Sequence, residues 1–285
     1  MKTISHSMPN AEYHATPAVG SSGLKLVQRS PLHYWAAYRD PNRERREPTP
    51  LMRIGTAWHA AIFEPGKFES DYIELPEGLD RRTKEGKALY AEVEATGREP
   101  LSASTMAQIK AMAEAAATHP ASRVLFEQCE GLGEASLFWV DTETGVNCKI
   151  RPDYHVPPCA LFPSGLIVDG KSIDDASAEP FARSAWNGGH HLQAAFYADG
   201  FQQVYGTEKP PTFMWLVQER EAPYATAYYS ASDDLVEYGR RQYRRLLAVI
   251  TKCEAEGQWP GYPTGVQPMA LPAWAAKVVQ EGVAA

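Results

Sequence analysis

The sequence predicts an α/β (α+β) fold in which a central mixed β-sheet is flanked by helices, with a helical N-terminal elaboration. Helical periodicity and composition dominate the chain up to residue 128. Runs rich in β-branched and aromatic residues then follow between residues 135 and 169. Two helical segments, two more strand-like runs and a long amphipathic helix complete the order, which is typical of a mixed sheet covered by helices.

The N-terminal region is predicted to consist mainly of helices. Ser30-Pro31 has the cap-then-proline order of a helix start. The polar, proline-flanked stretch 40–50 is expected to be an exposed loop. Glu64-Pro65-Gly66 is expected to end the helix that precedes it. The predicted helices span residues 32–38, 54–63, 83–95, 102–118 and 120–128.

Strand-like runs and helices follow in the second half of the chain. Residues 141–145 are expected to form a turn between two strands. The predicted strands span residues 135–140, 146–154, 166–169, 213–218 and 225–230. The predicted helices span residues 176–186, 190–205 and 233–256. We expect one domain over residues 1–285, with a proline-containing, loop-rich tail at 257–285.

Composition places the chain among ordinary globular proteins. It has 28 Lys and Arg against 35 Asp and Glu, a net charge of −7, which argues against charge-driven coating of nucleic acid by the whole surface. No stretch reaches the roughly 18 apolar residues of a membrane span, and the first residues lack the apolar core of a signal peptide. Four cysteines without CxxC spacing suggest reduced thiols. We expect a cytoplasmic protein without a membrane partner.

Two carboxylates and a lysine are the most informative residues. Asp169-Gly170-Lys171 follows a short apolar run, and Asp153 ends the strand-like run before it. Because residues i and i+2 of a strand point to one face, Asp169 and Lys171 are expected side by side, with Asp153 arriving from the neighbouring strand. Two carboxylates and an ammonium at one point suit a hard divalent cation such as Mg²⁺ and a polarised water, which is the chemistry of phosphodiester hydrolysis.

Each residue of this group has a predicted role. Asp153 and Asp169 would bind Mg²⁺, and the Gly170 carbonyl would add an oxygen ligand. Lys171 would hold the attacking water or stabilise charge on the phosphate. The alternative is a surface strand end with ordinary charged residues. The continuous apolar run before Asp169 suggests a buried strand and favours the metal site.

Four further residues are candidates for the same site. Glu134, at the start of the first strand-like run, would supply another carboxylate or would face solvent. His59 shares a helix face with apolar residues, a pattern typical of a buried histidine as well as of a ligand. Gln193 and Tyr197 lie at i and i+4 on one helix face, where a phosphate, the surroundings of the metal or ordinary polar packing would satisfy them.

In their order, these segments resemble the RecE (exonuclease VIII) branch of the PD-(D/E)XK nuclease superfamily, over roughly residues 10 to 250. The similar segments are 22–38, 55–59 with Glu64-Pro65, 134–139, 145–153, 168–172 and 181–197. The resemblance implies a restriction-endonuclease-like fold with a catalytic core at about 50–256. Three departures stand out: Gly170 where the family usually has an apolar residue, Ser172 for threonine, and a long connection at 155–164.

The resemblance also implies roles for individual residues. It assigns the metal to His59, Asp153 and Asp169, beside the Gly170 carbonyl that the strand pattern already offers. The catalytic and supporting residues implied in this way are His59, Glu134, Asp153, Asp169, Lys171, Gln193 and Tyr197.

The implied activity is a Mg²⁺-dependent, processive 5′→3′ exonuclease on double-stranded DNA ends, with Mn²⁺ as a substitute metal. It would leave 3′ single-stranded overhangs for a RecT-like single-strand annealing protein in phage or prophage recombination. A ring-shaped homo-oligomer is implied as well, which would gather basic residues of an acidic protomer in a channel. The residues proposed to reach DNA are Arg240, Arg241, Arg244 and Arg245. For these, and for the basic stretches 39–53 and 81–87, a solvated surface is the alternative.

Three other functions stay open. A related nuclease with another polarity or a single-strand preference would carry the same residues. A catalytically inactive DNA-end-binding protein is a second alternative, and the intact Asp153, Asp169 and Lys171 argue against it. An unrelated α/β enzyme is the third, and no Gly-rich phosphate loop or GxSxG motif supports it.

Overall fold

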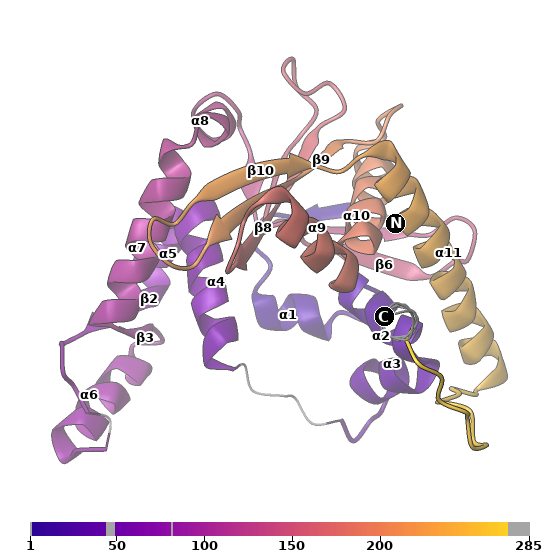
Figure 1. Cartoon of the computed structure of the whole chain (residues 1–285), viewed down its shortest axis with the longest axis horizontal. Coiled ribbons are helices and arrows are strands. Elements are labelled where there is room, and N and C mark those ends of the chain that lie inside the picture. The colour runs from indigo at the N-terminus through magenta and orange to yellow at the C-terminus, as the bar shows by residue number, and fades with distance from the viewer. Residues whose placement is uncertain (1, 44–48, 81, 273–285) are drawn as a thin grey trace, which may run out of the picture.

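The computed structural model describes residues 2–43, 49–80 and 82–272 (Figure 1). Residues 44–48 of the predicted loop, Arg81 of a predicted basic stretch and residues 273–285 of the predicted tail lie outside these ranges. The described part of the tail, 257–272, contains no helix or strand.

A five-stranded mixed sheet lies at the centre of the molecule, in the strand order β10-β9-β8-β7-β4. Strands β8 and β9 run parallel, and the other neighbours are antiparallel. The strands are β4 (Leu132–Gly133), β7 (Tyr154–Val156), β8 (Leu166–Ile173), β9 (Thr212–Glu219) and β10 (Thr226–Ser230). The predicted mixed sheet flanked by helices is therefore confirmed.

The predicted strand 146–154 is wrong as a single element. It divides into β6 (Asn147–Ile150), which pairs with β5 (Ser136–Val140) and β1 (Thr3–Ser5) in a separate sheet, and β7, which pairs with β8. The break falls at residues 151–153, where Pro152 has no N–H to donate to a ladder. Asp153 consequently lies in a corner between two sheets.

Strand β8 is longer than predicted and continues through Lys171 to Ile173. Parallel pairing with β9 explains the extension, because Asp169 lies opposite Trp215 and Lys171 opposite Val217 in the register. The acid-x-Lys triplet is thus held inside a paired strand, not at its free end. A rigid strand fixes side chains more precisely than a loop does.

Eleven helices lie in the described residues, and every predicted helix is present among them. They are α1 (Asn10–Ala15), α2 (Ser21–Arg29), α3 (Pro31–Tyr38), α4 (Pro50–Phe63), α5 (Pro65–Asp71), α6 (Lys84–Ala95), α7 (Ala103–Thr118), α8 (Pro120–Glu127), α9 (Ala178–Asn187), α10 (His190–Tyr205) and α11 (Asp233–Glu256). Pro65 does not only follow α4: it starts α5, because proline suits the first helical position. Within the same ranges, no helix has the length and apolar character to cross a bilayer.

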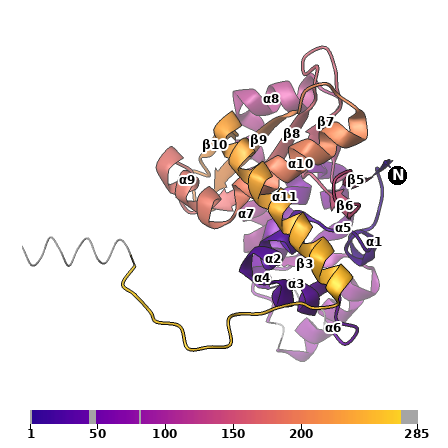
Figure 2. The ribbon, with the colours of Figure 1, turned by 90° about the vertical axis from the view of Figure 1, so that its right-hand side faces the viewer.

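Helices cover both faces of the sheet (Figure 1). One face packs against α4, α7 and α8, and the other against α2, α10 and α11, which crosses α10 in Figure 2. Strand β8 divides its side chains between them, since Leu166 and Val168 join the first core and Ile167 joins the second. By this alternation Asp169 and Lys171 face the α10 side, and Gly170 faces α4. A separate pair of short parallel strands, β2 (Tyr72–Leu75) and β3 (Glu99–Ser102), frames α6.

The unusual Gly170 has a packing reason. A Cβ atom at this position would lie 2.9 Å from the Phe63 ring and 3.1 Å from the Trp58 ring. Both aromatic residues belong to α4, so this helix approaches the backbone of β8 without an intervening side chain. His59, between them in sequence, is brought close to Asp153, which directly precedes β7.

Candidate active site

Three potential metal ligands meet where α4 reaches the sheet. His59, Glu134 and Asp153 each offer a ligand atom, and these atoms all lie within 4.8 Å of one another. The Nδ1 atom of His59 is 3.3 Å from Oδ2 of Asp153. The three residues come from α4, from the segment between β4 and β5, and from the corner before β7. The structure thus brings together three residues that lie far apart in the sequence and were candidates for one site.

Asp153 is fixed against strand β8. Its Oδ2 atom accepts a 2.6 Å hydrogen bond from the backbone N–H of Gly170. Tyr154 pairs with Val168, and this register brings Asp153 level with Asp169. Although burial opposes ionisation, the neighbouring His59 and Lys171 lower the pKa of Asp153 below its ordinary value. The carboxylate is therefore ionised and ready to bind a cation.

Asp169 and Lys171 form the ion pair expected from their spacing. The Lys171 ammonium contacts Oδ2 of Asp169 and lies 3.3 Å from the carbonyl oxygen of Gly170. The other carboxylate oxygen of Asp169 accepts a 2.7 Å hydrogen bond from Gln193 Nε2 on α10. Burial raises the pKa of Asp169, against the lowering effect of Lys171. The lysine is held from two sides and remains partly accessible, with 23% of its side chain exposed.

Glu134 occupies a left-handed backbone conformation, with φ of 49°. Its N–H donates a 3.1 Å hydrogen bond to the carbonyl of Asp153, which holds the two acids together. Such conformations cost about 1–3 kcal/mol for a residue other than glycine and concentrate at functional sites. Burial, followed by the charge of Asp153, raises the pKa of Glu134 to about 8. A divalent cation at this point would favour the ionised form.

The imidazole of His59 lies next to the Asp153 carboxylate in the same cluster. Burial lowers the pKa of His59, but the adjacent Asp153 carboxylate outweighs it, so the pKa lies above its ordinary value. A metal ion would have to displace the proton, since histidine binds metals in its neutral form. Metal binding at this site is accordingly expected to release protons.

Tyr197 supports the corner between the two sheets. Its hydroxyl donates a 3.4 Å hydrogen bond to the carbonyl of Arg151, two residues before Asp153. Burial raises the pKa of Tyr197 well above its ordinary value, so the group stays a donor. Tyr197 is best described as a positioning residue, whereas Gln193 on the same helix face contacts Asp169 directly.

The donor set fits a divalent cation. Carboxylate oxygens suit Mg²⁺ and Mn²⁺, and the imidazole of His59 suits Mn²⁺ better than Mg²⁺. Asp169 and the Gly170 carbonyl adjoin the set, but Lys171 contacts both. The cluster opens into a cavity of about 410 Å³, whose lining includes His59, Glu134, Asn10 and Arg151.

Three residues near the site escaped the sequence analysis. Gln218 is a fully buried amide on β9, and it accepts a 2.7 Å hydrogen bond from Trp58. The sequence indicated Gln218 only by placing a single amide residue within an otherwise apolar predicted strand. Lys25 and His190 lie within electrostatic range of Lys171, and their own sequence segments gave no such indication.

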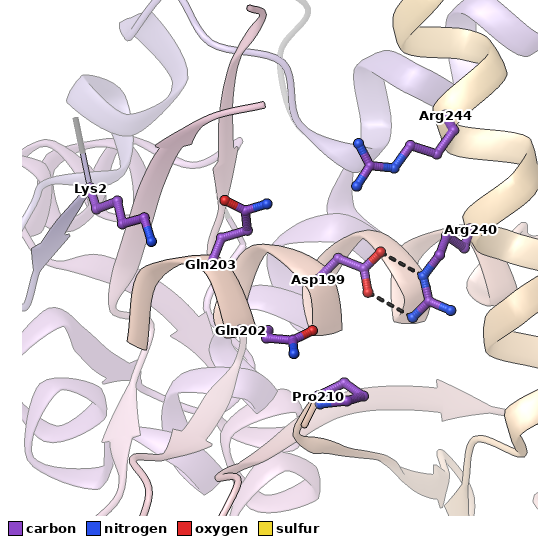
Figure 3. Close-up of a pocket in the computed structure, with 7 residues that line it drawn as sticks. All are labelled: Lys2, Asp199, Gln202, Gln203, Pro210, Arg240 and Arg244. Atoms are coloured by element: carbon purple, nitrogen blue, oxygen red, sulfur yellow. Dashed lines mark hydrogen bonds and ion pairs between the residues drawn. The ribbon is translucent and has the colours of Figure 1, made fainter. Parts of the chain in front are cut away.

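The four arginines proposed to contact DNA lie on α11, where Arg240 and Arg244 are partly buried and Arg241 and Arg245 are exposed. Arg240 forms a two-pronged ion pair with Asp199 (Figure 3) and also contacts Glu237. Arg244 pairs with Asp141 at 2.6 Å, and Arg241 lies 3.6 Å from Glu237, while Arg245 is exposed. A second cavity, of about 540 Å³, lies beside Arg240, Arg244 and Lys2. Contact of these residues with DNA remains a prediction.

Comparisons with known proteins agree with this architecture. A crystal structure described as a "Putative exonuclease" from Eubacterium rectale superimposes with a TM-score of 0.59 at 12% identity, covering 95% of this chain and 98% of that chain. A second structure, SSO0001, gives a TM-score of 0.31 at 12% identity over 69% of this chain and 86% of that chain, which is too low to indicate a shared fold. No curated protein matches the chain.

The family comparison bears on the predicted resemblance. The PD-(D/E)XK part of that prediction is confirmed, and the RecE branch stays a prediction. A family model described as a PDDEXK-like domain of unknown function (DUF3799) matches residues 20–269, and the chain belongs to this family.

Proposed function

We propose that the protein is a metal-dependent exodeoxyribonuclease that digests double-stranded DNA from its ends in the 5′→3′ direction. The observation that carries the proposal is the Asp169–Lys171 pair on β8, held beside the cluster of His59, Glu134 and Asp153. Membership in a PDDEXK-like family supports it, as does the fold shared with the protein described as a "Putative exonuclease".

Each residue of the site would have its own role in phosphodiester hydrolysis. His59, Glu134 and Asp153 would hold a divalent cation, with Asp169 and the Gly170 carbonyl next to it. When bound, Mg²⁺ or Mn²⁺ polarises the phosphoryl oxygen and lowers the pKa of a bound water.

Lys171 would orient the attacking water and stabilise the negative charge that develops on the phosphate. Asp169 positions the ammonium, and Gln193 holds Asp169 in turn. Because each link is a short contact between rigid elements, small displacements are expected to lower the rate strongly.

The wider assignment rests on the resemblance to the RecE branch. We propose Mg²⁺ as the working metal, with Mn²⁺ as a substitute, and 3′ single-stranded overhangs as the product. The proposed partners are DNA ends, a RecT-like annealing protein and further copies of this chain in a ring. A cytoplasmic, phage-type recombination role would follow from these partners.

The test is digestion of linear duplex DNA labelled at either the 5′ or the 3′ end. Wild type with Mg²⁺ should release the 5′ label first, and EDTA should abolish the release. Lys171→Ala should lower the rate at least about 100-fold. Lys252→Ala, an exposed lysine on α11, is the matched control and should act as wild type.

The remaining outcomes separate the alternatives. Early release of the 3′ label, or digestion of single strands alone, would indicate a related nuclease with another polarity or preference. Absence of cleavage of any DNA by wild type with Mg²⁺ or Mn²⁺, combined with binding to duplex ends, would indicate an inactive end-binding protein.

A further inference from the structure

A second lysine lies within electrostatic range of the proposed catalytic lysine. Lys25, on α2, is half-buried and lies within electrostatic range of both Lys171 and Asp169. Burial, followed by the positive charge of Lys171, lowers the pKa of Lys25 to about 8. An ammonium placed next to another ammonium and partly out of water costs free energy unless an anion compensates for it.

The carboxylate of Asp169 lies within electrostatic range of Lys25 but forms no ion pair with its ammonium. Among residues 2–43, 49–80 and 82–272, no side chain or carbonyl forms an ion pair or hydrogen bond with the Lys25 ammonium. Lys149, another lysine with a lowered pKa, differs in this respect, because its ammonium donates hydrogen bonds to the carbonyls of Tyr13 and Thr16. Unlike that of Lys149, the ammonium of Lys25 therefore keeps its donors free among the described residues.

The start of α10 adds further hydrogen-bond donors near the Lys25 side chain. The Lys25 side chain lies against Gly189, where a Cβ atom would be 3.4 Å from Cε, and Gly189 adopts a φ of 64° as α10 begins. No side chain caps this helix start. His190 follows directly, and its Nδ1 atom is buried without a hydrogen-bond partner.

The same helix start connects this corner to the acidic centre. His190 and Gln193 are three residues apart and therefore lie on one face of α10, within about one turn of 5.4 Å. Gln193 donates to Asp169, so α10 carries both the start that Lys25 contacts and a side chain that contacts the Asp169–Lys171 pair.

We propose that Lys25 and His190 form a phosphate-binding subsite, which takes a DNA phosphodiester next to the one that is cleaved. The subsite lies on the α2–α10 side of Lys171, opposite the cluster of His59, Glu134 and Asp153. The inference rests on the proposed nuclease function and deepens it. Lys25 is a substrate-binding residue in this assignment, since it touches a phosphate that is not broken.

The experiment measures duplex DNA binding with Ca²⁺ in place of Mg²⁺, as a function of salt. Lys25→Met should weaken binding about tenfold and reduce the slope of log K against log salt by about 1, because one phosphate contact is lost. Lys25→Arg should restore most of the affinity. The matched control is Lys252→Met, which removes an exposed cation elsewhere and should keep both values.

Two further readouts distinguish binding from a structural role. The Tm of Lys25→Met should equal or exceed that of wild type, because an unpartnered, half-buried ammonium has been removed. If cleavage is active, the same variant should raise KM more than it lowers kcat, whereas Lys171→Ala should lower kcat.

Unchanged affinity and salt slope in Lys25→Met would overturn the subsite, as would a loss of Tm together with the affinity. A second result would also overturn the DNA subsite. If inorganic phosphate alone raises the Tm of wild type but not that of Lys25→Met, while both proteins bind DNA equally, the corner binds free phosphate. Wild type that binds DNA through Lys25 but cleaves nothing would refute the nuclease and leave the subsite standing.

Discussion

The indole N–H of Trp58 donates a 2.7 Å hydrogen bond to Oε1 of the buried Gln218. This contact joins α4, which carries His59, to β9, which pairs with the strand of Asp169 and Lys171. The amide nitrogen of Gln218 is used as well, by the carbonyl of Met112 at 2.8 Å. Helix and sheet are thereby locked in register at the residue next to the proposed ligand.

Trp58→Phe is expected to destabilise the protein by about 1–3 kcal/mol, because Oε1 of Gln218 would remain buried without its donor. The metal ligands would also lose part of their alignment, so the rate should fall more than the affinity for DNA. Chemical denaturation and single-turnover cleavage measure the two effects. Trp186→Phe, an exposed tryptophan on α9, should change neither.

Gly170→Ala tests the close approach of α4. The added methyl group would lie 2.9 Å from Phe63, an overpacking that typically costs about 1–3 kcal/mol. We expect a lower denaturation midpoint and slower cleavage. Gly66→Ala provides the contrast, because no atom lies within 4 Å of a Cβ built there and alanine favours a helix. Equal stability of the two variants would contradict the packing explanation.

Glu134→Gln tests the acidic centre through pH. Burial raises the pKa of Glu134 from 4.5 to about 8. In the metal-free protein, folding therefore favours the protonated form, and this stability is complete below about pH 4.5 and lost as the pH rises through 8.

A glutamine side chain cannot ionise, so in EDTA the Glu134→Gln variant should match wild type near pH 4.5 and become more stable than it above pH 8. Each kcal/mol would correspond to about 2–4 °C in Tm. Glu114→Gln, on an exposed face of α7, should follow wild type at every pH. With saturating Mn²⁺, wild type should become more stable than Glu134→Gln, since only the ionised glutamate binds a cation.

Features of this site that depend on local chain geometry could be predicted from the sequence, and features that depend on tertiary packing could not. Asp169 and Lys171 were predictable as neighbours because side chains alternate along any strand, wherever that strand lies. The cluster of His59, Glu134 and Asp153 joins residues nearly a hundred positions apart. Only the resemblance to a family grouped them before the structure placed them together.

Other features depended on tertiary packing and were beyond the sequence patterns. The break between β6 and β7 followed from which partner each strand took, although Pro152 marked the position. Lys25 gave no local indication of its place, because a lysine at the middle of an amphipathic helix usually faces solvent. Its closeness to Lys171 arises only when α2 packs beside α10.

Metal binding should stabilise the protein. Ligand that binds only the folded state adds about 2.7 kcal/mol at one hundred times its Kd, so Mn²⁺ and Mg²⁺ should each raise the Tm, with Mn²⁺ acting at lower concentration because of His59. His59→Ala should weaken Mn²⁺ binding about 10–100-fold. His6→Ala, an exposed histidine, should leave the titration unchanged. Equal Mn²⁺ affinity in His59→Ala would remove this residue from the ligand set.

The Arg240→Ala variant tests whether Arg240 serves in an internal ion pair or in a contact with DNA. Both carboxylate oxygens of Asp199 accept hydrogen bonds from Arg240 at 2.8 Å, and the Tyr243 hydroxyl donates to the same group at 2.5 Å. Loss of the guanidinium would leave a largely buried carboxylate half-satisfied, so we expect a loss of about 1–3 kcal/mol in stability. Arg241→Ala, whose side chain is 73% exposed, should cost little.

The salt dependence of DNA binding decides whether Arg240 has a second role. If α11 lines a DNA channel, the exposed Arg241 and Arg245 are freer to reach phosphates than Arg240, which Asp199 and Glu237 already neutralise in part. The Arg241→Ala and Arg245→Ala variants should then each lower the slope of log K against log salt by about 1, with the Tm unchanged. Arg240→Ala should lower the Tm instead. An unchanged slope in both exposed variants would place the DNA path elsewhere on the molecule.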